Sequence, residues 1–109
     1  MKTFDIAGKV TGSGEYVLGS DDTGSHACYM IYGVLKPGER GRELKPGNGH
    51  EELILVLRGD LHVTGQFRGT IKEGQAVHLS GEETLQAENN GATEAVYVIA
   101  GGHPNDGHH

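Results

Sequence analysis

The chain has 109 residues, with nine Lys and Arg against fifteen Asp and Glu, nineteen glycines and no tryptophan. This length suits one domain, and the formal net charge of −6 argues against a nucleic-acid partner, because phosphate backbones attract basic surfaces. No apolar run is long enough to cross a bilayer, and the first residues contain no apolar signal segment. The single cysteine, Cys28, fits a reducing compartment. We therefore expect a cytoplasmic protein with no membrane partner.

Short apolar runs alternate with turn residues along the whole chain, which is typical of an all-β protein. Cys28 lies in one of these runs and is expected to be a small buried side chain. Strands are expected over residues 4–10, 15–18, 27–35, 52–57, 61–64, 69–72, 76–79, 84–88 and 94–100.

A charged loop is expected between the third and fourth of these strands. Four of the nine basic residues gather there, namely Lys36, Arg40, Arg42 and Lys45. Such a loop is either a lid that binds a carboxylate or phosphate group, or a solvated segment of mixed charge. The mixed charge favours the solvated segment.

The strand over 52–57 is apolar on both of its faces. Alternate residues of a strand point to opposite sides, so Glu52, Ile54 and Val56 share one face, and Leu53, Leu55 and Leu57 share the other. The first face should line a barrel interior. The second needs a cover, which the strands over 4–10 and 15–18 can supply only in part. We therefore expect a homodimer.

The segment from Pro46 to Asp60 joins a glycine-rich turn, a His/Glu cluster, an apolar strand and a hairpin turn. Glu52, followed by six residues and Gly59, resembles the second half of the first cupin motif, G-x5-H-x-H-x(3,4)-E-x6-G. In cupins the two histidines and the glutamate of this motif hold a divalent metal inside a small β-barrel. Pro46 and Asn48 stand here where the two histidines are expected.

A second cupin motif, G-x5-P-x-G-x2-H-x3-N, can be placed on Gly74 to Asn89, with Leu85 in the position of its metal-binding histidine. The resemblance covers roughly residues 30 to 100. It implies an all-β, cupin-like jelly-roll β-barrel formed as a single domain by residues 1–102. Residues 103–109, which include His103, His108 and His109, are expected to be a flexible tail.

The residues Asn48, His50 and Glu52 alternate, so they share a face if the strand extends back through Gly49. Imidazole and carboxylate groups suit Zn, Fe, Mn or Ni. A further ligand would come from another histidine, and His78 is preferred because it lies beside the second motif. His26 is expected in a solvated turn and His62 on an exposed strand. The alternatives are a metal site at His50, Glu52 and His78, or a hydrogen-bonded His50–Glu52 pair without metal.

Two functions remain open on this basis. The protein either binds a small molecule in the barrel without metal, through Asn48, His50, Glu52 and His78, or it is a metal-dependent enzyme of the dioxygenase, isomerase or lyase type. The leucine at position 85 favours binding, because it removes the ligand that the second motif would supply. The sequence names no catalytic residue.

Overall fold

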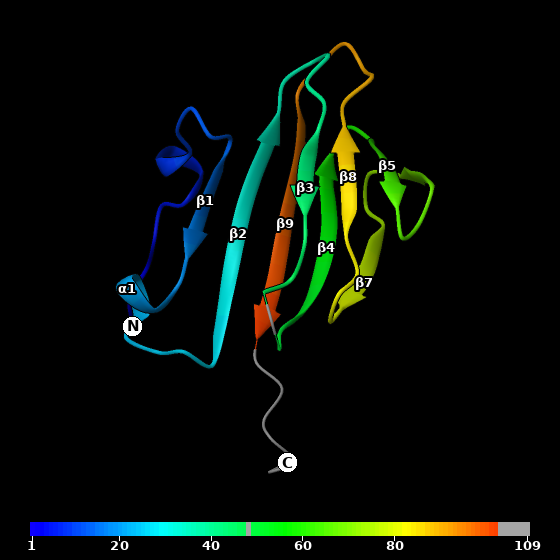
Figure 1. Ribbon diagram of the computed structural model, residues 1–109. Coiled ribbons are helices and arrows are strands. Elements are labelled where there is room, and N and C mark those ends of the chain that lie inside the picture. The colour runs from blue at the N-terminus through cyan, green and yellow to red at the C-terminus, as the bar shows by residue number, and fades with distance from the viewer. Residues whose placement is uncertain (48, 103–109) are drawn as a thin grey trace.

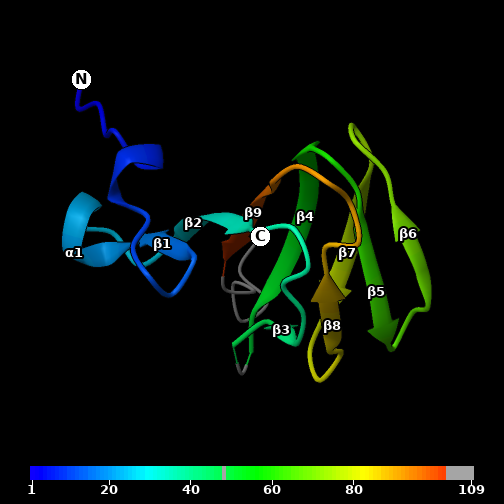
Figure 2. The same ribbon diagram turned by 90° about the horizontal axis from the view of Figure 1, so that it is seen from above.

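The computed structural model describes residues 1–47 and 49–102. Two antiparallel sheets lie face to face in this part of the chain, as Figures 1 and 2 show. The larger sheet has the strand order β1-β2-β9-β4-β7, and the smaller has the order β3-β8-β5-β6. The strands are β1 (Glu15–Leu18), β2 (Cys28–Leu35), β3 (Arg42–Leu44), β4 (Glu51–Arg58), β5 (Leu61–Gly65), β6 (Gly69–Ile71), β7 (Ala76–Ser80), β8 (Leu85–Glu88) and β9 (Ala95–Gly102). The expected all-β jelly roll is confirmed.

The hydrophobic core lies between the two sheets. In β4 the residues Glu52, Ile54 and Val56 are buried and their neighbours are exposed, as the alternating pattern predicts. Leu61 and Leu85 close the core from the smaller sheet, and both are fully buried. Burying an aliphatic side chain of this size contributes about 1.5–3 kcal/mol. Leu85 is therefore a packing residue, which explains the apolar side chain at this position.

The first predicted strand, over residues 4–10, is wrong. A short 3-10 helix, Ala7–Lys9, stands there instead. The amide of Gly8 donates to Asp5 Oδ1 at 3.4 Å, and the amide of Lys9 donates to the carbonyl of Ile6 at 3.1 Å. These local bonds compete with the ladder that a strand would need.

The charged loop contains a strand that the sequence did not reveal. β3 pairs with β8 through Arg42↔Ala87 and Leu44↔Leu85, and Leu44 is buried. A strand of three residues shows too little alternation of apolar and polar side chains to be recognised, and two of its three residues are charged. Arg42 therefore does not lie in a solvated loop, whereas Arg40 is exposed and contacts Glu88 at 3.3 Å.

The outer face of the larger sheet is apolar and open. Leu53, Leu55 and Leu57 are 54%, 37% and 46% exposed. β1 extends the edge of this sheet beside β2, so it does not cover the outer face as expected. α1 (Ser20–Thr23) follows β1. Cys28 is exposed at the start of β2, where it pairs with Gly102, so the expected burial of its side chain is wrong.

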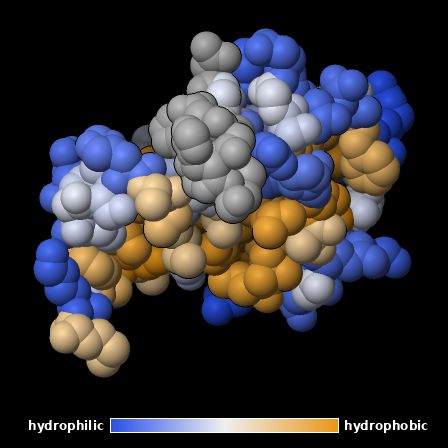
Figure 3. Space-filling model, turned by 90° about the horizontal axis from the view of Figure 1, so that it is seen from below, coloured by the Kyte–Doolittle hydropathy of each residue, from blue (hydrophilic) through white to orange (hydrophobic). Residues whose placement is uncertain are grey.

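Figure 3 shows hydrophobic side chains gathered along one side of the molecule. No helix of the described residues is long and apolar enough to cross a membrane.

Candidate functional site

The buried carboxyl group of Glu52 is the most unusual feature of the barrel interior. Glu52 is only 4% exposed although it carries an ionisable group, and such groups are almost never fully buried without a partner. Its neighbour across the sheet on β9 is Gly101, whose neighbour on β2 is Tyr29. The hydroxyl of Tyr29 donates a hydrogen bond to Glu52 Oε2 across this row. The three strands thus place a tyrosine and a glutamate together on the inner face.

Gly101 makes this contact possible because it has no side chain. A Cβ atom at Gly101 would collide with the ring of Tyr29, so any larger residue would push the tyrosine away from Glu52. This is the close approach for which strands use glycine.

His50 lies next to the same tyrosine, immediately before β4. The ring centroids of His50 and Tyr29 are 5.5 Å apart, and the two planes are tilted by 59°. Gly47 leaves room for the imidazole, since a Cβ atom there would collide with His50 Nδ1. The His50 amide donates to the carbonyl of Gly47 at 2.8 Å, which forms the turn. His50, Tyr29 and Glu52 are therefore neighbours in space, and His50 is half-buried.

The two oxygens of Glu52 differ in their surroundings. Oε2 accepts the Tyr29 hydrogen bond, whereas Oε1 is buried and has no hydrogen-bond partner in the described part of the chain. Burial raises the pKa of Tyr29, and so do the hydrogen bond to Glu52 and the charge of its carboxylate. Tyr29 therefore keeps its proton and uses it in the hydrogen bond to Oε2. An unpaired buried acceptor of this kind costs about 1–3 kcal/mol.

His78, which the sequence placed in the site, faces the other way. It pairs with Leu53 and shares the outer face with it, and its Nε2 lies 2.8 Å from Glu51 Oε1. Leu79 is the β7 residue opposite Glu52. The expectation that His78 joins His50 and Glu52 is therefore wrong, because neighbouring strand residues point to opposite faces.

Of the other histidines considered from the sequence, His26 and His62 lie in the described part of the chain. Asn48 and the tail histidines 103, 108 and 109 lie outside the described residues. His26 is exposed, as expected for a turn residue. His62 is half-buried in β5, and its Nδ1 lies 3.0 Å from Thr70 Oγ1. It is thus more enclosed than the exposed strand residue that we expected.

The described residues supply too few ligands for a resident divalent metal. Within the described residues, no three His, Cys, Asp or Glu side chains gather closely enough to hold one. A protein site for Zn or Fe generally supplies at least three ligands. His50 and Glu52 could supply two, and Leu85 and His78 add none.

A second polar network lies at the other end of the larger sheet, and the sequence did not indicate it. Tyr97 is fully buried, and its hydroxyl donates to Glu15 Oε2. Arg42 Nη1 donates to the Tyr97 hydroxyl oxygen at 2.8 Å, and Arg42 Nη2 donates to Glu39 Oε2 at 3.0 Å and to the carbonyl of Val34 at 3.1 Å. Burial raises the pKa of Tyr97, as does its bond to Glu15. Arg42 thus fastens β3 to the larger sheet.

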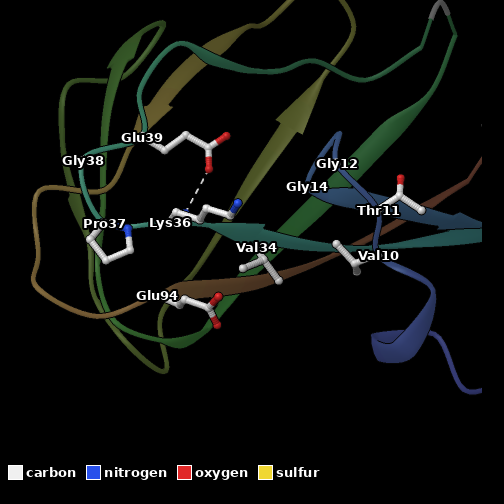
Figure 4. A pocket seen from close by; sticks show the side chains of 10 residues that line it. All are labelled: Val10, Thr11, Gly12, Gly14, Val34, Lys36, Pro37, Gly38, Glu39 and Glu94. Atoms are coloured by element: carbon white, nitrogen blue, oxygen red, sulfur yellow. Dashed lines mark hydrogen bonds between the residues drawn. The ribbon is translucent and has the colours of Figure 1, made fainter.

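A cavity of about 620 Å³ lies outside the barrel, near this second network (Figure 4). Its walls come from the segment before β1, the end of β2, the following turn and the start of β9, with Val10, Thr11, Gly12, Gly14, Val34, Lys36, Pro37, Gly38, Glu39 and Glu94 as lining residues. The turn is held by the Lys36 amide, which donates to Glu39 Oε1 at 2.9 Å. No lining residue carries a buried side-chain nitrogen or oxygen without a partner in the described structure. The outer cavity has the space for a ligand, but Glu52 has the buried oxygen without a hydrogen-bond partner. We therefore take Glu52 as the centre of the candidate site.

Known proteins resemble the chain in structure rather than in sequence. Neither a family model nor a curated protein sequence matches it. A conserved protein with a double-stranded β-helix domain from Klebsiella pneumoniae superposes with a TM-score of 0.73 at 14% identity, covering 98% of this chain and 94% of that chain.

Two further structures carry more specific descriptions. The Cupin_2 domain of an XRE family transcriptional regulator from Enterobacter cloacae gives a TM-score of 0.67 at 20% identity, over 84% of this chain and 99% of that chain. A predicted oxalate decarboxylase from Thermotoga maritima gives 0.67 at 19% identity, over 83% of this chain and 81% of that chain. The protein therefore has the double-stranded β-helix fold of the cupins.

Proposed function

We propose that the protein binds a small molecule inside the barrel, at the cluster of Tyr29, His50 and Glu52, without a resident metal. The observation that carries this proposal is the buried Glu52 Oε1, which has no partner among the described residues. A buried carboxylate oxygen is stabilised only when a donor reaches it. A ligand that donates to Oε1 would complete the site. The aromatic rings of Tyr29 and His50 would contact its apolar part.

Binding is tested by titrating the full chain with a library of small polar metabolites and following backbone and side-chain NMR signals. Ligands should shift the signals of Tyr29 and His50. They should bind at least about tenfold more weakly to Glu52→Gln, because a hydrogen bond to a charged group is worth about 1.5–3 kcal/mol. Glu51→Gln is the matched control, since Glu51 is the preceding residue and faces outward. Ligands that shift only the walls of the outer cavity, or bind Glu52→Gln normally, would contradict the proposal.

The second candidate is a metal-dependent enzyme of the dioxygenase, isomerase or lyase type. The likeness to a predicted oxalate decarboxylase favours it, although at 19% identity this likeness extends to the fold alone. The enzyme would need ligands besides His50 and Glu52. Metal analysis of protein purified without chelators, with the residues after Gly102 removed, separates the two candidates. Stoichiometric Zn, Fe, Mn or Ni that is lost in His50→Ala would favour the enzyme.

We further propose that two copies associate through the outer face of the larger sheet. Leu53, Leu55 and Leu57 form an exposed apolar strip on β4. Met30 on β2 is also exposed and lies in the same row as Leu53, with Ala100 of β9 between them. Large patches of this kind are uncommon on soluble monomers. Sedimentation should give twice the chain mass of 11.6 kDa at micromolar concentration. Leu55→Asp should give a monomer, whereas Phe67→Asp, an exposed control outside this strip, should not; a wild-type monomer would contradict the proposal.

A further inference from the structure

The two oxygens of Glu52 restrict the kind of ligand that can bind, if the proposed function is right. Tyr29 occupies Oε2 with its only hydroxyl proton, and the raised pKa of that hydroxyl keeps the proton in place. Oε1 is therefore the atom that remains for a ligand. The two oxygens therefore differ as acceptors, because Oε1 accepts no hydrogen bond in the described structure and Oε2 already accepts one.

Charge is the second restriction. No salt bridge to Glu52 is formed in the described part of the chain, whereas Glu15 and Glu39 both lie beside Arg42. A buried carboxylate is stabilised more by a cationic donor than by a neutral one, because the cation offsets the charge as well as filling the acceptor. The side chains beside it, Tyr29 and His50, are aromatic, and their faces attract cations.

Shape is the third restriction. A guanidinium or amidine group donates through two parallel N–H bonds and matches both oxygens of a free carboxylate. At Glu52 such a pair would have to share Oε2 with the Tyr29 hydroxyl, so it gains less than at a free carboxylate. Oε1 is also enclosed, so the donor that reaches it must be small. A primary ammonium group is compact, cationic and able to donate a single bond.

We propose that the ligand is a primary amine, that its ammonium group donates to Glu52 Oε1, and that Tyr29 sets this specificity by competing for Oε2. Tyr29 is a positioning residue in this arrangement, because it acts on the ligand through Glu52. The preference for ammonium over guanidinium then depends on one hydroxyl group.

The test uses three matched probes, namely ethylamine, ethylguanidine and ethanol, titrated into the full chain with NMR detection at Tyr29 and His50. Ethylamine should bind at least about tenfold more tightly than either of the others, the factor expected for one charge-assisted hydrogen bond. Tyr29→Phe should narrow the gap between ethylamine and ethylguanidine, since Oε2 becomes free. Glu52→Gln should abolish the preference for ethylamine, and Glu51→Gln should leave it unchanged.

Equal binding of the three probes, or no binding of ethylamine at millimolar concentration, would overturn the inference. So would Zn²⁺ shifting the Tyr29 and His50 signals where ethylamine does not. An unchanged preference in Tyr29→Phe would show that Tyr29 does not set the specificity. An uncharged library ligand whose binding requires Glu52 would contradict the inference that the ligand is an amine, but it would support the proposed binding function. The two failures are therefore distinguishable.

Discussion

The two ends of the larger sheet use the same local arrangement with different outcomes. At one end the ring of Tyr29 crosses Gly101 and its hydroxyl donates to Glu52. At the other end the ring of Tyr97 crosses Gly33 and its hydroxyl donates to Glu15. Each tyrosine has a raised pKa, and burial is the largest cause in both cases. The pairs differ in what surrounds the glutamate.

Arg42 is the difference between the two ends. It binds the Tyr97 hydroxyl and lies 3.9 Å from Glu15 Oε2, so the second network is closed within the protein. Glu52 has no such cation in the described residues, and one of its oxygens has no partner. A closed network contributes to stability, and an incomplete one costs stability that a ligand can restore. The comparison teaches that Arg42 completes the Tyr97 network within the protein, whereas the Tyr29 network keeps one buried acceptor unpaired in the described residues.

The largest effect is expected from removing the cation of the closed network. Arg42→Met should lower the free energy of unfolding by about 3 kcal/mol, because Glu15, Glu39 and the Tyr97 hydroxyl lose their common partner. Urea unfolding measures this change. Arg40→Met is the control, since Arg40 is exposed and its pair with Glu88 should contribute less than about 1 kcal/mol. Similar losses of unfolding free energy in the two variants would contradict the role of Arg42 in the closed network.

The next effect concerns the glycines under the two rings. A Cβ atom at either Gly33 or Gly101 would collide with a tyrosine. Gly33→Ala should destabilise by about 2 kcal/mol, because Tyr97 is fully buried and has no free space to move into. Gly101→Ala should cost less, since the partly exposed Tyr29 can swing outward. Thermal unfolding of both variants measures which one loses more stability. A larger loss in Gly101→Ala than in Gly33→Ala would mean that the Tyr29 end is the more rigid of the two.

A smaller effect separates the two glutamates. Glu15→Gln should destabilise by about 1 kcal/mol, because it weakens charge-assisted bonds to Tyr97 and Arg42 at a site that is partly exposed. Glu52→Gln should leave the stability of the ligand-free protein nearly unchanged or raise it, because it removes a buried charge with an unpaired oxygen. Denaturant unfolding of both variants in parallel measures the contrast. A large loss in Glu52→Gln would mean that Oε1 is already paired.

The smallest effect is expected in alkaline solution. Both tyrosines have a folded-state pKa above the ordinary value of 10.0, so the folded protein holds these protons more tightly than the unfolded chain. The stability this provides is fully present below pH 10 and is lost as the pH rises above it. Tyr97→Phe should reduce the pH dependence of the free energy of unfolding more than Tyr29→Phe does, because Tyr97 is the more buried of the two. Urea midpoints at about pH 9 and pH 11 test the order, which equal slopes would refute.

Alternation along the chain was enough to predict much of the fold and one residue of the candidate site. The sequence 52–57 places Glu52 with Ile54 and Val56, and the structure buries all three. The outward direction of His78 was also readable, because Val77 and Leu79 flank it and Leu79 belongs to the core. Giving the histidine priority over this apolar alternation was the error. Local periodicity determines which face of a strand a side chain joins.

Only the tertiary structure decided which side chains meet. Tyr29 reaches Glu52 because β9 lies between β2 and β4, with Gly101 in register with both residues. Arg42 on β3 of the smaller sheet reaches Tyr97 on β9 of the larger sheet because the two sheets lie face to face. The charges of the segment around Arg42 had suggested a solvated loop. Strand order and register depend on contacts between distant parts of the chain, which no local pattern of residues encodes. The sequence by itself determined the barrel and the inward glutamate, and the pairing of strands decided which network is closed and which has an unpaired acceptor among the described residues.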